Sequence, residues 1–83
     1  MKVQVGDVVH YVAYGTPGGE YKSGDHRAAI VADVLDAEQG KIVAFVINPR
    51  GVHFNEAVYD QAGTKPATWH WIEREITHRT LER

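Results

Sequence analysis

Apolar and polar residues alternate along much of the chain, and this pattern predicts β-strands. In 8–14 (VVHYVAY), side chains at even positions would share one face and those at odd positions the other. The segment 27–35 (RAAIVADVL) alternates in the same way, and Asp33 indicates that one of its faces is partly solvated. The segment 41–48 (KIVAFVIN) is apolar on both faces, which is typical of a strand in the middle of a sheet.

Turn signals separate these segments and the strands that follow. The five residues 36–40 (DAEQG) predict a hairpin loop, and NPRG at 48–51 predicts a tight turn with proline in its second position. Beyond that turn we expect a brief strand at 52–54 and a last one at 68–72 (TWHWI).

The predicted fold is a single, mainly β domain spanning 1–83. Four or five short strands joined by hairpins, and therefore antiparallel, fit either a small SH3-like barrel or a strongly bent sheet. Long loops are expected at 15–26 and 55–67. The tail 73–83 fits a short C-terminal helix, a frayed end or one more strand.

Composition and charge limit the class of protein. The chain of 83 residues is 43% apolar and 24% charged, which is typical of a globular domain. It has no cysteine, which excludes disulfides and thiolate zinc sites and fits a cytoplasmic protein. No signal-peptide pattern or apolar run of about 20 residues is present, so we expect no membrane association. A formal net charge of -2 argues against general nucleic-acid binding without excluding it.

Motifs for catalysis are missing from the sequence. The glycine-rich segment has neither the spacing nor the following helix of a P-loop or a dinucleotide-binding fingerprint. Ser23, the single serine, is not in a nucleophile elbow, and no carboxylate pair has a spacing that marks acid–base catalysis. None of the five histidines forms an H-x-H or H-x-x-x-H pair, although a metal site assembled from separate strands stays open. We therefore expect a protein that is not an enzyme and needs no cofactor.

The loop at 15–26 is the strongest candidate for a binding site. The stretch YGTPGGEYKSGDHR contains four of the eight glycines and is longer than most connections in a small domain. Glycines let a ligand approach backbone N–H groups, tyrosines offer stacking faces, and arginine can bind phosphate through two donors. The alternative is that the glycines only permit tight turns. The candidate ligand-binding residues are Tyr14, Gly18, Gly19, Tyr21, Lys22, Arg27, Arg50 and His70.

The motif TWHW has two interpretations. Trp69 and Trp71 are expected on one face of a strand and His70 on the other. If the tryptophans belong to the core, His70 is exposed and available to a ligand. If they form an aromatic binding surface, His70 is buried instead.

Four segments resemble a family of small proteins from actinobacteria and their phages. They are, in order, GDVVHYVAYGTPGGEY, RAAIV, NPRGVHFN and GTKPATWHW, within residues 6–71. Two positions depart from the family pattern: His26 stands where a cysteine precedes Arg-Ala-Ala, and Ile72 stands where a proline follows the second tryptophan. The chain also lacks a cysteine-containing insertion of some relatives, so no metal role of those cysteines is transferred. The family has no settled activity, and the resemblance implies a phage or actinobacterial setting.

Two functions from different classes follow as hypotheses. The first is a non-enzymatic protein that holds a small anionic, nucleotide-derived ligand and sequesters a host immune signal in the host cytoplasm. Such a small chain is expected to form a homo-oligomer with the ligand between subunits. The second is an SH3-like module that binds a protein or nucleic-acid partner. A small hydrolase or metal enzyme ranks third.

Overall fold

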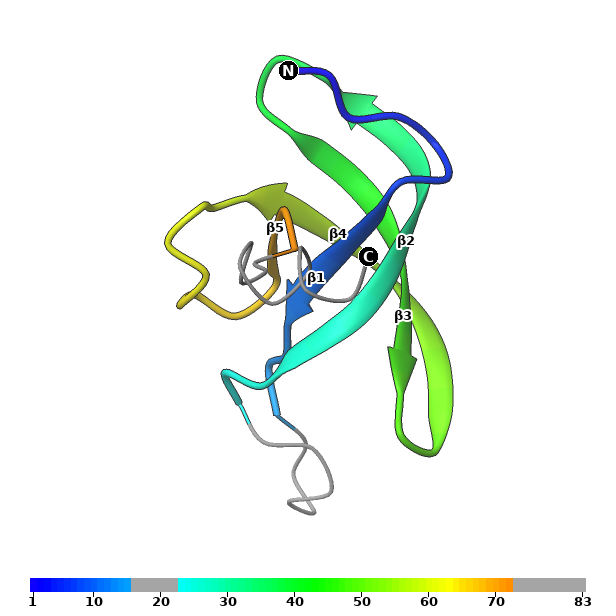
Figure 1. The fold of residues 1–83 in the computed structure, drawn as a ribbon, viewed down its shortest axis with the longest axis vertical. Helices are drawn as coiled ribbons and strands as arrows, with labels where there is room; N and C mark the ends of the chain where they lie inside the picture. The colour runs from blue at the N-terminus through cyan, green and yellow to red at the C-terminus, as the bar shows by residue number, and fades with distance from the viewer. Residues whose placement is uncertain (16–22, 73–83) are drawn as a thin grey trace, which may run out of the picture.

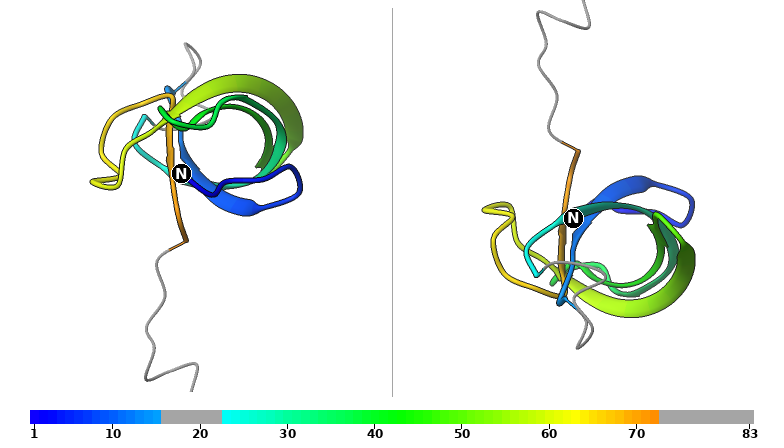
Figure 2. Two further views of the ribbon diagram at one scale, coloured as in Figure 1. Left: turned by 90° about the horizontal axis from the view of Figure 1, so that it is seen from above. Right: turned by 90° about the horizontal axis from the view of Figure 1, so that it is seen from below.

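The chain folds into a five-stranded β-barrel. The computed structural model describes residues 1–15 and 23–72 (Figure 1). The strands are β1 (Val8–Val12), β2 (His26–Asp36), β3 (Lys41–Asn48), β4 (Gly51–Tyr59) and β5 (Thr68–His70). They close in the order β1-β2-β3-β4-β5, and a ring is seen along the barrel axis (Figure 2). The predicted small, mainly β barrel is confirmed, and the open bent sheet is excluded.

Two further expectations concern helices. The short C-terminal helix considered for 73–83 lies outside the described residues. Over the part of the chain that the structure describes, no helix has the length and apolar character needed to cross a membrane.

One seam of the barrel is parallel, contrary to the wholly antiparallel arrangement expected. Four strand pairs are antiparallel, including β1 with β5, whereas β4 and β5 run parallel through Val58–Thr68 and Tyr59–Trp69. A closed ring with an odd number of strands must contain at least one parallel pair, because directions cannot alternate all the way round. The connection 60–67 provides the crossover and passes outside the ring (Figure 2).

The fourth strand is longer than predicted and the fifth is shorter. The expected strand 52–54 extends over Gly51–Tyr59, so the loop predicted at 55–67 begins only at residue 60. Asn55 is of a type depleted in strands, but its pairing with Ala44 of β3 outweighs that local preference. The expected strand 68–72 ends at His70, before Trp71.

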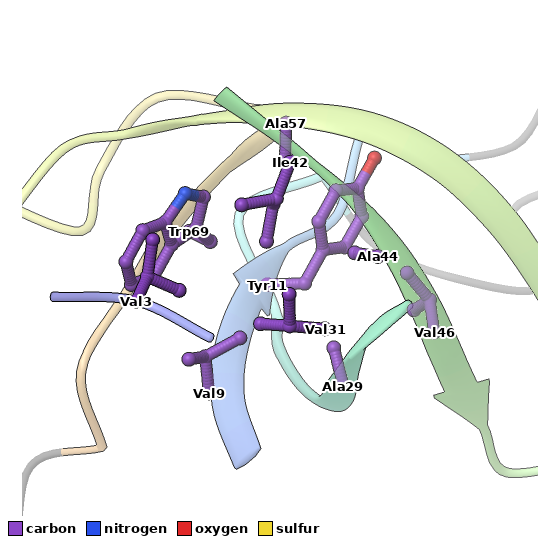
Figure 3. Close-up of a cluster of buried hydrophobic side chains, with 10 residues drawn as sticks. All are labelled: Val3, Val9, Tyr11, Ala29, Val31, Ile42, Ala44, Val46, Ala57 and Trp69. Atoms are coloured by element: carbon purple, nitrogen blue, oxygen red, sulfur yellow. The ribbon is translucent and has the colours of Figure 1, made fainter. Parts of the chain in front are cut away.

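The core combines two aromatic rings with small aliphatic side chains. It comprises Val3, Val9, Tyr11, Ala29, Val31, Ile42, Ala44, Val46, Ala57 and Trp69, which Figure 3 shows together. Trp69 is fully buried, and its Nε1 donates a hydrogen bond of 2.7 Å to the carbonyl oxygen of Gly40. This bond ties β5 to the β2–β3 turn and satisfies the one polar group of the indole ring.

A bulge changes which face of β2 is buried. The pairing with β3 shifts between Val31 and Asp33, so Val31 is in the core while Asp33 and Leu35 are exposed. Val34 packs against the core instead. Strict alternation placed Leu35 on the same face as Val31, and an inserted residue reverses that assignment.

Candidate ligand-binding site

A pocket of about 380 Å³ opens beside the end of β1. Its described wall combines aromatic rings with side-chain amides and is formed by Tyr11, Ala13, Tyr14, Gly15, Asn48, His53, Phe54 and Asn55. These residues come from β1 and the residues after it, and from the β3–β4 hairpin. The β1–β2 connection brings Ser23 beside Gly15 at the rim, since a Cβ on Gly15 would lie only 2.9 Å from the backbone nitrogen of Ser23.

One amide organises both tyrosines of the pocket. Asn55 Nδ2 donates hydrogen bonds to the hydroxyl oxygens of Tyr11, at 2.7 Å, and Tyr14, at 3.1 Å. Both hydrogens of that nitrogen are thereby used, and Oδ1 of Asn55 remains as an acceptor for a ligand. Each tyrosine hydroxyl accepts one of these bonds, and a further side-chain hydrogen bond joins Tyr11 to Tyr14. Tyr11 is only 1% exposed, so the cluster offers a ligand the Oδ1 acceptor of Asn55 and the exposed side chain of Tyr14.

A second amide sets the tautomer of the pocket histidine. Asn48 Nδ2 lies 2.9 Å from His53 Nδ1. An amide nitrogen can only donate, so Nδ1 accepts and the neutral imidazole carries its proton on Nε2. The ring of His53 also meets the ring of Tyr11 edge to face, at 6.1 Å between centroids. His53 thus contributes a donor whose orientation two neighbours hold.

Burial raises the pKa of the Tyr11 hydroxyl. Desolvation is the main cause, the hydrogen bond from Asn55 opposes it, and the neighbouring Tyr14 adds to it, so the pKa lies above the usual 10.0. A tyrosine is already protonated at neutral pH, and the shift therefore matters only in the alkaline range.

The structure places the predicted site residues in different regions. Tyr14 lines the pocket. Arg27 forms an ion pair of 3.0 Å with Asp25, and Arg50 is exposed on the β3–β4 turn; neither lines the pocket. His70 is buried in the barrel wall beside His10 and His26. Four further candidates lie outside the described residues: Gly18, Gly19, Tyr21 and Lys22.

Neither interpretation of TWHW is correct. Trp69 is in the core and Trp71 is 37% exposed, yet His70 is also buried, with 1% of its surface exposed. The chain leaves the sheet after His70, so Trp71 does not repeat the environment of Trp69. The turn at Gly63 covers the outward face of β5, since a Cβ on Gly63 would lie 3.0 Å from Cε1 of His70.

Of the eight described residues that line the pocket, only Tyr14 was among the candidates from the sequence, and three of the seven missed carry polar side chains from the β3–β4 hairpin. Asn48, His53 and Asn55 meet only because the β3–β4 hairpin pairs Val46 with His53 and Ala44 with Asn55. The available signal was the two-residue spacing of His53 and Asn55, which puts both on one face of a strand. That signal was hidden because the strand was expected to end at 54.

A scan against models of protein families and searches of curated proteins and of solved structures found no match to this chain. The function is therefore argued from the chemistry of the pocket.

Proposed function

We propose that the protein is a non-enzymatic binding protein whose pocket holds the planar ring of a small, nucleotide-derived ligand. The main support is that Tyr11, Tyr14 and Asn55 converge and so place aromatic surface beside hydrogen-bonding groups. A heterocyclic base needs both, because it has apolar faces and an edge of donors and acceptors. The volume of about 380 Å³ lies at the lower end of the range for small-molecule sites.

The composition of the wall supports binding over catalysis. Across the pocket lining that the structure describes there is no carboxylate, serine or cysteine, so neither a general acid–base pair nor a nucleophile of these kinds faces the ligand. His53 is present, and its Nδ1 is hydrogen-bonded to the side chain of Asn48.

We assign the binding of such a ligand's phosphate groups to the glycine-rich loop. The described lining contains no lysine or arginine, so the pocket itself suits the base better than the anion. The loop begins at Gly15 on the pocket rim, and its sequence includes Lys22. Sequestration of a host immune nucleotide is the specific form of this proposal that the resemblance to phage proteins favours.

Calorimetric titration and thermal unfolding with nucleosides, nucleoside monophosphates, dinucleotides and cyclic oligonucleotides test the proposal. A ligand at about 100 times its Kd should raise Tm by roughly 10 °C in a domain of this size. Tyr14→Ala should weaken binding about 5- to 150-fold, because base stacking on one aromatic ring contributes about 1–3 kcal/mol. Lys22→Ala should weaken the binding of nucleotides and leave the binding of nucleosides unchanged.

Tyr59→Phe is the matched control, since it alters a tyrosine outside the pocket and should leave Kd unchanged. Tyr14 is 56% exposed, so its replacement should not unfold the protein. Lack of binding across the panel, or an unchanged Kd in folded Tyr14→Ala, would refute the assignment.

The outer surface of the barrel favours a second candidate, an interaction module. Cross-strand neighbours place apolar side chains in two adjoining rows, one over β1 to β4 and one over β2 to β4. This outer apolar face comprises Val8, Ile30, Phe45, Ile47, Val52 and Phe54. A contiguous apolar surface marks an association site in many proteins. We propose a second copy of this chain as its occupant, in keeping with the expected homo-oligomer.

A further inference from the structure

Three histidines that are distant in the sequence meet on the outward side of the barrel wall. His10 comes from β1, His26 from β2 and His70 from β5. One ring nitrogen from each lies within 4.8 Å of those of the other two. The ring centroids of His26 and His70 are 4.7 Å apart, and those of His10 and His70 are 5.6 Å apart. The strand pairing creates the cluster, because His10 is directly opposite His70.

A backbone carbonyl sets the tautomer of His26. Its Nε2 lies 3.0 Å from the carbonyl oxygen of Gly63. A carbonyl can only accept, so Nε2 carries the proton and Nδ1 has the lone pair. Histidines that bind metals usually donate their other ring N–H in this way to a carbonyl or carboxylate, which fixes the orientation of the ring.

Gly63 also allows the turn to approach the cluster closely. Its φ is +69°, and an added Cβ would lie 3.0–3.4 Å from three atoms of the His70 ring. A side chain at this position would therefore be strained and would press on that ring. The turn holds His26 and covers His70, while the side chain of His26 itself is exposed.

We propose that His10, His26 and His70 bind one divalent transition-metal ion, with Zn²⁺ as the best fit. Imidazole nitrogens are ligands for zinc, copper and nickel, whereas magnesium and calcium require oxygen. Three imidazoles leave a fourth tetrahedral position for water or another ligand. Zn–N bonds of about 2.0–2.1 Å need nitrogens roughly 3.4 Å apart, which small rotations of the rings achieve from a separation within 4.8 Å.

The position of the cluster suggests what the ion does. β5 has only three residues and pairs with β1 through two, so the closing seam of the barrel is short. An ion held by β1, β2 and β5 would join the three strands at this seam. A bound metal or a disulfide can add stability to a small domain, and this chain has no cysteine. The site shares no residue with the pocket lining and is independent of the proposed ligand.

Titration of untagged, EDTA-treated full-length protein with Zn²⁺ tests this proposal. Calorimetry should give one ion per chain, and Zn²⁺ at about 100 times its Kd should raise Tm by roughly 10 °C. Co²⁺ substituted for Zn²⁺ should show the visible absorption of a tetrahedral site. His26→Ala should weaken Zn²⁺ binding at least 100-fold, whereas His26→Cys should retain it, because a thiolate is also a zinc ligand.

His53→Ala is the control, since His53 is a described histidine outside the cluster, and this variant should bind Zn²⁺ as the wild type does. His26 is the main test position because it is exposed, whereas replacing the buried His70 risks unfolding the barrel. Failure to bind one Zn²⁺ per chain, or unchanged affinity in folded His26→Ala, would show that the three rings only pack together.

Discussion

Individual hydrogen bonds to a side-chain amide or a backbone carbonyl organise both candidate sites. Asn55 holds two tyrosine hydroxyls, and Asn48 sets the proton position on His53. The backbone of Gly63 does the same for His26. In each case a group that can only donate or only accept fixes the role of its partner, and the chemistry offered to a ligand follows from that.

The Tyr11 hydroxyl makes stability depend on pH in the alkaline range. Because burial raises its pKa above 10.0, the folded state retains this proton when the unfolded state has lost it. The contribution is complete below the unfolded pKa and is lost as pH rises through the higher folded pKa. The free energy of unfolding of the wild type should therefore fall above pH 10, measured by urea unfolding with tryptophan fluorescence.

Tyr11→Phe provides the comparison for this effect. At pH 8 the variant should be less stable by about 1 kcal/mol, through loss of the hydrogen bond with Asn55. Its deficit should shrink as pH rises above 10. Parallel stability curves for the two proteins would show that Tyr11 does not cause the alkaline loss.

Among the elements, the turn between β2 and β3 anchors the β2–β3 hairpin to the rest of the barrel. Gly40 accepts the hydrogen bond of Trp69, and its backbone lies close to Met1 and Tyr59. The N-terminus lies beside this turn, as Figure 1 shows. A five-residue hairpin loop was expected here from its length and its glycine, but its role as an anchor for the core depends on three distant segments.

Gly40→Ala should destabilise the protein by about 2 kcal/mol or more. The φ of Gly40 is +69°, and the new Cβ would lie 2.6 Å from Cβ of Tyr59 and 2.9 Å from Sδ of Met1. Gly51→Ala is the matched control, since nothing lies within 4 Å of its added Cβ, and it should change stability by no more than about 0.5 kcal/mol. Urea unfolding of both variants measures the difference; equal stabilities would contradict the contact.

At the scale of the whole molecule, the barrel has two different outward surfaces. The histidine cluster is on β1, β2 and β5, and the outer apolar face extends from β1 to β4. On this face Phe45 and Phe54 pack at 5.0 Å between centroids, although Phe54 is 65% exposed. Burying such side chains in a dimer would contribute about 25 cal/mol of favourable free energy per Å² of apolar surface, before the entropic cost of association.

Val52→Lys should shift the protein from dimer to monomer if the outer apolar face is the interface. Val52 is exposed on that face and outside the pocket lining, so the charge would oppose association without removing a ligand contact. Leu35→Lys is the control, because Leu35 is similarly exposed at the far end of β2. Light scattering after size-exclusion chromatography gives the mass. A wild type that is monomeric at high concentration, or a Val52→Lys variant that stays dimeric, would exclude this interface.

Parts of both candidate sites were accessible from the sequence. Tyr14 was identified from its place beside the glycine-rich loop, and it does line the pocket. For His70 the sequence left both an exposed and a buried position open, and the structure buries it beside two other histidines. The other pocket residues are brought together by strand pairing and register, which a short sequence motif does not reveal.

Local patterns were enough to predict the first three strands, their turns and the all-β character of the described chain, because strand residues alternate every two positions and turn residues act locally. Other features depend on contacts between distant strands. Closure of an odd-numbered ring requires the parallel β4–β5 seam, and the bulge in β2 exchanges Leu35 for Val34 at the core. The meeting of His10 with His70 depends on the same closure through the β1–β5 pairing, whereas the β1–β2 pairing already brings His26 close to His10.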